Sequence, residues 1–415
     1  MVGAATACLL ARSGFSVTVL EIREPRQYKP DKSVGLRVSA LSPGSQSVLG
    51  EAGAWRQVSE GRHCDYHRMQ VEDREPGSSL DFDAAEFGLE QLGTIVENEL
   101  VQWSLWQSLQ TLGGVDLICP AELDEVDFSG SHARVSLKDG RLLSTRLVLG
   151  ADGADSAVRN AMGIGQQRWS YGQQGIVAVV KTAKPNQGIA WQRFLTGGPL
   201  AFLPLSDGQS SIVWSLPDAD ARRILELDDA GFCAALNSAC RVGNSDEAPD
   251  DWLFGAALES GPRASFPLHM QLSDTYFANK AALLGDAAHV VHPLAGQGVN
   301  IGFLDAAALV EVLLRARNRG EDFAGEQVLQ SYSRWRRSEA EVMARSIHSI
   351  RSMFTPEFLS PLRRLGLGLV SRSWILKESF IKRAAGRNRD APALARGKTL
   401  GELMRTQKHQ GNGIL

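Results

Sequence analysis

The sequence of 415 residues contains only five cysteines, and no two of them have CxxC spacing. It shows no signal peptide, so we expect a reduced, cytoplasmic setting. No apolar run approaches the roughly 18–20 residues that a membrane helix requires, although a peripheral contact at the inner face of a membrane stays open. The net charge is only −3, which argues against a nucleic-acid partner.

What the sequence does contain is an ordinary globular composition, with 43% hydrophobic and 22% charged residues. The chain is long enough for two or more domains. Residues 3–13 carry small side chains and predict a helix, which Gly14 can end because glycine accepts the left-handed conformation. Residues 15–21 (FSVTVLE) predict a buried strand, and residues 98–112 predict a second helix.

Four β-rich segments follow one another in the middle of the chain, at residues 174–181, 189–195, 200–205 and 210–216. Turn residues separate the last three segments. The pattern predicts an antiparallel sheet inserted in a chain that is otherwise α/β. Trp191 and Trp214 lie in this sheet and are candidates to line a pocket beneath it. From residue 300 onward the sequence predicts mostly helix.

The first motif is an incomplete dinucleotide-binding pattern at the start of the chain. Such folds run from a strand through GxGxxG into a helix, a second strand and an acidic residue. Gly3 stands where the third glycine belongs, and Glu21 closes the second strand near the usual spacing of about 20 residues. The Glu21 carboxylate would accept hydrogen bonds from ribose hydroxyls. The first strand and the first two glycines are absent, and on these residues alone ordinary α/β packing is the stronger interpretation.

The second motif, GADGADSAVR at residues 150–159, directly follows a predicted strand. Ligands bind at the carboxyl ends of strands in sheets of this kind, which makes Asp152 a candidate ligand residue. Arg159 could pair with Asp152 or with a phosphate. The alternative is an ordinary strand, turn and helix in which Asp152 is the cap.

The third motif is the most specific, and it occupies residues 281–300 (AALLGDAAHVVHPLAGQGVN). A buried strand ends at Gly285 and Asp286, where the Asp286 carboxylate could accept a hydrogen bond from a hydroxyl of a bound cofactor. Gly296, Gln297 and Gly298 then open a helix. Glycine lets the backbone approach a cofactor ring, and the N-terminus of a helix favours negative charge such as that of a reduced flavin.

The string GDAAHVVHPLAGQGVNIGFLDAAAL at residues 285–309 resembles the flavin signature of the ubiquinone-biosynthesis hydroxylases, within the wider para-hydroxybenzoate hydroxylase class. Further strings of the same family appear at residues 36–42 (LRVSALS), 95–98 (IVEN) and 202–205 (FLPL). The resemblance extends from Gly3 to about residue 386. It looks closest to the VisC-type members, which hydroxylate a polyprenylphenol, on the strings at 120–123, 203–207 and 211–216.

The resemblance implies an α/β fold with an α+β insertion. A Rossmann-like FAD-binding domain, lacking its first strand, would comprise residues 1–60, 95–160 and 270–330. A substrate domain with an antiparallel sheet would comprise residues 61–94 and 161–269. A helical C-terminal region would follow at residues 331–415.

The resemblance also implies which residues bind the cofactor, and it places Arg37 beside the flavin and Gln102 near the phosphates. The implied cofactor-binding residues are Gly3, Glu21, Arg37, Gln102, Asp152, Gly285, Asp286, Pro293, Gly296, Gln297, Gly298 and Asn300. NADPH or NADH would reduce FAD while bound transiently near Asp152, since the sequence has no second dinucleotide fold. Molecular oxygen would then form a flavin C4a-hydroperoxide, which the ring of a polyprenylphenol attacks. No residue is singled out as a catalytic acid or base.

Several alternatives stay open. Asp286, His289 and His292 fit a two-His-one-carboxylate iron site, but the histidines of a flavin loop are expected to pack or to bond to backbone, so we predict no metal. The reaction could concern another ring position, or a later methoxy-benzoquinol intermediate. The chain could also be a non-catalytic flavin-fold subunit of a biosynthetic complex.

The C-terminal segment at residues 361–387 combines many basic residues with interleaved apolar ones. Such an amphipathic helix can lie on an anionic lipid surface, dock on a partner of a ubiquinone-biosynthesis complex, or pack on its own body.

The start of the chain also carries a prediction. Members of the family begin with a strand and Gly-Gly-Gly-Met-Val-Gly, whereas this sequence begins at Met1-Val2-Gly3. We therefore expect an upstream strand and a glycine-rich turn in the natural protein. A chain that starts at Met1 is expected to bind FAD poorly, because the turn brings the backbone close to the pyrophosphate.

Overall fold

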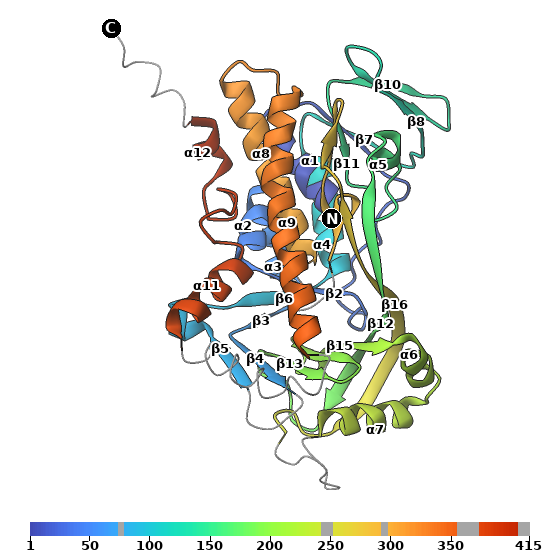
Figure 1. Ribbon diagram of the computed structural model, residues 1–415, viewed down its shortest axis with the longest axis vertical. Helices are drawn as coiled ribbons and strands as arrows, with labels where there is room; N and C mark the ends of the chain where they lie inside the picture. Colours follow the sequence, from blue (N-terminus) through green and yellow to red (C-terminus); the bar gives the residue numbers. More distant parts are fainter. Residues whose placement is uncertain (74–78, 242–251, 292–297, 355–372, 406–415) are drawn as a thin grey trace.

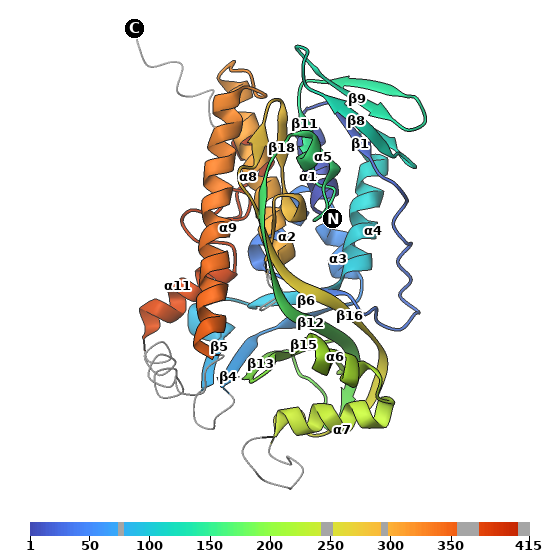
Figure 2. The same ribbon diagram turned by 45° about the vertical axis from the view of Figure 1, so that its right-hand side comes forward.

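The computed structural model describes residues 1–73, 79–241, 252–291, 298–354 and 373–405. The molecule is elongated, and its two ends are built differently (Figure 1). One end holds short strands packed between helices, and the other holds a large sheet with two helices beside it. The long strands β12 (Gln166–Thr182) and β16 (Ala257–Ser273) run from one end toward the other (Figure 2).

The end with the short strands contains two small sheets. β1 (Val17–Leu20) pairs in parallel with β7 (Val115–Ile118). β11 (Val148–Gly150) pairs in parallel with β18 (Ala281–Leu283), and β17 (Phe277–Ala278) pairs with β18 on its other side. Among the described residues β1 has a hydrogen-bonded neighbour on one side only. The parallel strands packed between helices agree with the predicted α/β fold.

Helices and an outer sheet enclose these strands. The helices are α1 (Val2–Arg12), α2 (Pro43–Glu51), α3 (Trp55–Glu60), α4 (Asn98–Thr111), α5 (Ala157–Ala161) and α8 (Gly298–Asn318), and the outer sheet comprises β8 (Leu123–Asp127), β9 (Ala133–Leu137) and β10 (Leu142–Thr145). α1 packs directly against α8 and against α4, and the fully buried Cys8 thiol donates to the Leu105 carbonyl oxygen of α4. Gly14 follows α1 with a φ of +81°, which confirms the predicted end of this helix.

The other end is an eight-stranded sheet. Its order is β19 (His289–Val290), β16, β12, β15 (Ser210–Pro217), β14 (Gly198–Pro204), β13 (Ile189–Leu195), β4 (Arg68–Asp73) and β5 (Ser79–Asp83). The four predicted strands correspond to β12, β13, β14 and β15. β14 pairs antiparallel with β13 on one side and with β15 on the other, as predicted.

Two features of this sheet differ from the prediction. β13 pairs with β4 in parallel, so the sheet is mixed rather than wholly antiparallel. β16 was not predicted, because Gly261 and Pro267 both disfavour a strand. Pairing with β12 along nearly the whole strand overrides that local preference.

Side chains on the central strands alternate between the two faces of the sheet, as the pleat requires. In β14, Leu200 and Phe202 are fully buried on one face, against α6 (Asp218–Leu225) and α7 (Asp229–Cys240). The intervening Ala201 and Leu203 face the opposite side and line a cavity. One face of the sheet is therefore core and the other is free to form a site.

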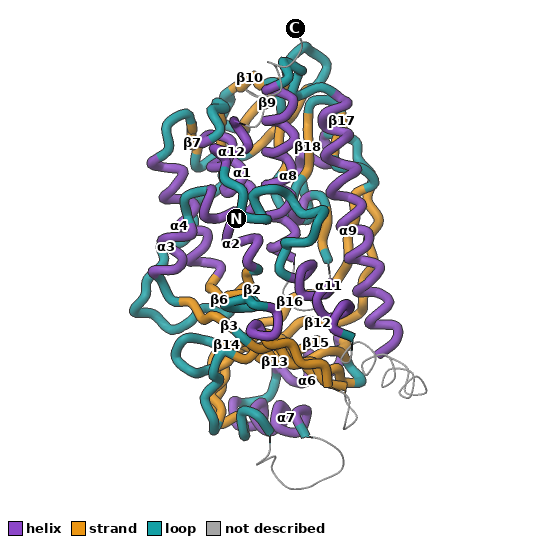
Figure 3. The backbone as a smooth tube through the Cα atoms, turned by 90° about the vertical axis from the view of Figure 1, so that its left-hand side faces the viewer, coloured by secondary structure: helices purple, strands orange, loops and turns teal. Residues whose placement is uncertain are grey.

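A further three-stranded sheet contributes Val38, Ala40 and Tyr66 to the lining of the cavity, and one of the C-terminal helices contributes Ile381. The sheet contains β2 (Val38–Leu41), β6 (Gly93–Glu97) and β3 (His63–Tyr66), and the helices are α9 (Glu326–Phe354), α11 (Trp374–Ala384) and α12 (Leu400–Arg405). α9 runs along one side of the molecule (Figure 3). No helix among the described residues is both long enough and apolar enough to cross a membrane.

Candidate functional site

The three sequence motifs meet at the N-terminus of α1. A Cβ atom built on Gly3 would lie 2.9 Å from the Cβ of Ala151, in the second motif. Cβ atoms built on Gly285 and Gly302 would lie 3.3 Å and 2.6 Å from Val2. Gly3, Gly285 and Gly302 thus leave no room for a side chain where α1 meets the second and third motifs and α8. The first N–H groups of α1 have no partner within the helix and form a potential anion site.

Two exposed carboxylates flank this helix terminus. Glu21 follows β1, and Asp286 is exposed although Gly285 and Ala287 on either side of it are buried. Burial lowers the pKa of the Met1 amino group, while the nearby charges of Glu21 and Asp286 act in the opposite direction. Both side chains therefore lie within electrostatic reach of the start of α1. Each offers oxygen acceptors for hydroxyl groups, as predicted from the sequence.

Asp152 and Arg159 do not pair with each other. The Asp152 carboxylate accepts a hydrogen bond from the Val158 backbone N–H at 3.2 Å, which is the capping role considered above. Arg159 is buried and donates to the carbonyl oxygen of Ala287 at 3.1 Å, so it joins the second motif to the third. Desolvation lowers the pKa of Arg159, and Asp152 partly offsets that effect.

A fully buried carboxylate, that of Asp305 on α8, holds the third motif in place. It accepts hydrogen bonds from the Gly285 backbone N–H at 3.1 Å, from His289 Nε2 at 2.6 Å and from Arg336 Nε at 2.7 Å. Burial alone would raise the pKa of Asp305, but the charges of His289 and Arg336 outweigh it and bring the pKa below its usual value. His289 is buried, which is one of the two expected alternatives, and its Nε2 bonds to a side chain rather than to backbone. The sequence analysis did not identify Asp305 or Arg336.

The side chain of Asn300, the last residue of the third motif, forms hydrogen bonds to other residues of the protein. Its Oδ1 accepts from the Ser42 N–H at 2.9 Å and from Ser45 Oγ at 2.7 Å, and its Nδ2 donates to the Ala40 carbonyl at 2.8 Å. Asn300 thus fixes the β2–α2 connection against α8. Gly298 begins α8. The predicted residues Pro293, Gly296 and Gln297, and also His292, lie outside the described residues.

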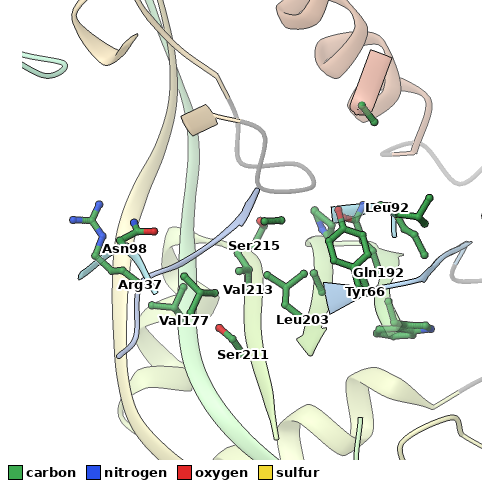
Figure 4. A pocket seen from close by; sticks show the side chains of 18 of the residues that line it. Arg37, Tyr66, Leu92, Asn98, Val177, Gln192, Leu203, Ser211, Val213 and Ser215 are labelled. Atoms are coloured by element: carbon green, nitrogen blue, oxygen red, sulfur yellow. The ribbon is translucent and has the colours of Figure 1, made fainter. Parts of the chain in front are cut away.

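Of two further predicted residues, Arg37 lines the cavity and Gln102 does not. Arg37 is exposed, and its carbonyl oxygen accepts the backbone N–H of Asn98 at 2.9 Å. Both residues line the cavity, and Figure 4 shows them together at one end of it. Gln102 is exposed one turn further along α4.

The cavity has a volume of about 280 Å³ and lies between the large sheet, β2, and α11. Its lining is mostly apolar, and its floor on β15 consists of the small residues Ser211, Val213 and Ser215. This size suits one substituted aromatic ring, because a cavity of about 150 Å³ already holds benzene. Trp191 and Trp214 both pack in the cluster of α6 and α7 on the opposite face of the sheet, and of the two only Trp191 also borders the cavity.

Two polar residues inside the cavity, Tyr66 and Gln192, were not predicted from the sequence. Tyr66 and Gln192, 8% and 7% exposed, lie at the end opposite Arg37 and Asn98 (Figure 4). Burial raises the pKa of Tyr66 to about 12, so its hydroxyl remains protonated at neutral pH. No sequence pattern links these two residues, since they are far apart in the chain and meet only through the packing of strands.

The C-terminal helix α11 packs partly on the body, which is one of the alternatives predicted for residues 361–387. Ile381 lines the cavity, and Lys377 is buried and pairs with Glu86 at 3.0 Å. Trp374 stacks on Phe87 with 4.9 Å between ring centroids, yet it remains 51% exposed. The part of the predicted segment before residue 373 lies outside the described residues.

Together these groups fit FAD. The helix terminus suits a pyrophosphate, the two exposed carboxylates suit hydroxyl groups of the ribose and ribityl chain, and the ring-sized cavity lies beyond Arg37. A dinucleotide site of this kind next to an apolar cavity defines a flavoprotein that acts on an aromatic ring.

Comparisons with known proteins agree. Residues 1–346 match the FAD binding domain family. The chain is 36% identical over 389 residues to the 3-demethoxyubiquinol 3-hydroxylase of Escherichia coli, covering 93% of this chain and 96% of that protein. It is 32% identical to the ubiquinone hydroxylase UbiL of Rhodospirillum rubrum, and the match covers 96% of this chain and 91% of that protein. The solved structure of pqsL, a probable FAD-dependent monooxygenase of Pseudomonas aeruginosa, shares the fold, with a TM-score of 0.71 at 24% identity, covering 88% of this chain and 96% of that one.

The protein is an FAD-dependent monooxygenase. It belongs to the FAD binding domain family, within the group of hydroxylases of ubiquinone biosynthesis. NADPH or NADH is the co-substrate typical of this family, as the sequence analysis expected.

We predict that Asp305→Ala lowers the free energy of unfolding by about 3–5 kcal/mol, because the substitution leaves Arg336 buried and without its carboxylate partner. Urea unfolding at pH 7 measures the difference. Asp322→Ala is the control, since it breaks an exposed pair with Arg146 and should cost no more than about 1 kcal/mol. Equal losses in the two variants would contradict the prediction.

The same network predicts a pH dependence. The folded-state pKa of Asp305 lies below the ordinary value of 3.8, so its stabilisation is complete above that value and is lost as the pH falls through the folded-state pKa. The difference in stability between the wild type and Asp305→Ala should therefore narrow as the pH falls below about 4.

Proposed function

We propose that this monooxygenase hydroxylates the ring of a polyprenyl-substituted quinol in ubiquinone biosynthesis. The observation that carries the proposal is the apolar, ring-sized cavity that continues from the cofactor-binding groups. The sequence favoured a 2-polyprenylphenol and kept a later methoxy-benzoquinol intermediate as an alternative. The printed name of the 36% identical relative, a 3-demethoxyubiquinol 3-hydroxylase, supports the later intermediate.

The protein's contribution to this reaction is binding, orientation and exclusion of water. Glu21, Asp286 and the terminus of α1 would hold the cofactor, and the small residues of β15 leave room for the ring. The apolar lining keeps water from the reacting atoms, which suppresses loss of activated oxygen as hydrogen peroxide. Bound FAD, once reduced by NADPH or NADH, supplies the activation of molecular oxygen.

The test is turnover of the FAD-loaded protein with short-chain analogues. A methoxy- and methyl-substituted hydroquinone with a short alkyl tail should stimulate NADPH or NADH oxidation and gain one ring hydroxyl, detected by mass spectrometry. A non-catalytic subunit would bind flavin but give no hydroxylated product with any of the phenol or quinol analogues, and that result would overturn the proposal.

Asp286→Ala should weaken FAD binding by about 1.5–3 kcal/mol, the usual cost of losing a hydrogen bond to a charged group. Fluorescence titration of FAD with the apoprotein measures the change. Asp124→Ala is the matched control, because Asp124 is an exposed carboxylate on β8, in the outer sheet. Unchanged FAD affinity in Asp286→Ala would show that this carboxylate does not bind the cofactor.

We further propose a peripheral contact between α11 and a lipid surface. Trp374 and Phe380 are 51% and 52% exposed on this helix, which also borders the cavity. Its basic residues contribute less, since Lys382 pairs with Glu378 at 2.8 Å and Arg383 with Glu339 at 3.2 Å. An aromatic surface beside the cavity would let a polyprenyl tail pass from lipid to the site.

The double variant Trp374→Ser, Phe380→Ser should lose binding to anionic vesicles at least tenfold, because burying each aromatic side chain is worth about 1.5–3 kcal/mol. Cosedimentation at low salt measures it. Trp169→Ser, which changes a 43% exposed tryptophan on β12, should bind as the wild type does. Wild-type protein that never sediments with the vesicles would exclude the contact.

A further inference from the structure

The cavity contains more polar groups than an apolar ring would need. Tyr66 and Gln192 are more than nine-tenths buried, and neither side chain has a hydrogen-bond partner among the described residues. The Oγ of Ser211, on the floor between the two ends, is also buried without a partner in the described part of the chain. Buried polar groups are nearly always paired in folded proteins, so each of these groups is a candidate to bind a ligand.

The position of the Tyr66 hydroxyl is determined by its strand neighbours. Tyr66 stands opposite Gly93 in the pairing of β3 with β6. A Cβ atom on Gly93 would lie 2.7 Å from the Tyr66 hydroxyl and 2.8 Å from the carbonyl oxygen of Leu41. The ring of Tyr66 therefore lies across the glycine, and any larger residue at position 93 would displace it.

Gln192 comes from a different strand and reaches the same end of the cavity. It lies on β13, on the same face as Ala190, which packs in one cluster with Tyr66. Figure 4 shows Tyr66 and Gln192 at one end, and Arg37 with Asn98 at the other. The two pairs of polar residues thus lie on opposite sides of the space that a ring would fill.

The chemistry of the pair indicates what it binds. The protonated hydroxyl of Tyr66 can donate a hydrogen bond, and the carboxamide of Gln192 can both donate and accept. A ring hydroxyl matches this pair, because it accepts from Tyr66 and donates to Gln192 Oε1. A methyl ether or a bare ring carbon would leave at least one of the two groups unpaired.

We propose that Tyr66 and Gln192 bind a hydroxyl group on the side of the substrate ring that faces away from Arg37, so that the enzyme selects hydroquinone rings over phenols with a single hydroxyl. This inference rests on the proposed function and on the place beside the flavin that the family resemblance implies for Arg37, toward which the reacting carbon would point. Binding the distal hydroxyl would hold the ring in one orientation and would set which carbon is hydroxylated.

The test compares two short-chain ligands, a methoxy- and methyl-substituted hydroquinone and the matching phenol that lacks the distal hydroxyl. Isothermal titration calorimetry without oxygen measures the affinity of the FAD-loaded wild type and of Tyr66→Phe and Gln192→Met. Tyr171→Phe, which removes a hydroxyl outside the cavity, is the control. Thermal unfolding checks that every variant folds as the wild type does.

The wild type should bind the hydroquinone about tenfold more tightly than the phenol. Tyr66→Phe and Gln192→Met should each lower the affinity for the hydroquinone about three- to tenfold and leave that for the phenol within about twofold. In turnover, the variants should raise KM for the hydroquinone more than they lower kcat. Tyr171→Phe should match the wild type in every measurement.

Equal affinity of the wild type for both ligands would overturn the inference, as would variants that weaken both ligands alike. A wild type that hydroxylates both rings without preference would refute this inference and leave the proposed function in place. A wild type that binds with the expected preference but forms no hydroxylated product would refute the proposed function and leave the binding role of Tyr66 and Gln192 in place.

Discussion

The buried carboxylate of Asp305 is the interaction on which the cofactor side of this molecule depends. It connects three elements that are distant in the sequence: the loop after β18, the helix α8 and the helix α9. A buried charge is tolerable only when partners surround it, and here Arg336, His289 and a backbone N–H do so. The position of Asp286, one residue beyond the bonded Gly285, follows from this network.

Close packing of small residues supplies the second constraint. α1 can approach the ends of β11 and β18 and the start of α8 only because Gly3, Gly285 and Gly302 present no side chain at these contacts. Larger residues there would push the terminus of α1 away from the carboxylates of Glu21 and Asp286. The acceptors and the helix terminus therefore act as one site only while these three positions remain small.

On the substrate side, the cavity follows from the alternation of side chains along the strands of the large sheet. One face of the large sheet is filled by aromatic and aliphatic side chains that pack on α6 and α7. The other face carries serine, alanine and valine on the central strands, and the cavity occupies the space that these small residues leave. Replacing a few residues of the second face would change the substrate without disturbing the core.

The sequence by itself determined the class of protein, the four central strands and the cofactor motifs, because these depend on local patterns: the glycines at strand ends, the period of the apolar residues and the string from Gly285 to Leu309. It did not reveal β16, whose glycine and proline are overridden by pairing with β12, nor the parallel partner of β13. Asp305 and Arg336, and likewise Tyr66 and Gln192, became neighbours only through tertiary packing. Such contacts join residues tens to more than a hundred positions apart, and no spacing rule within one segment encodes them.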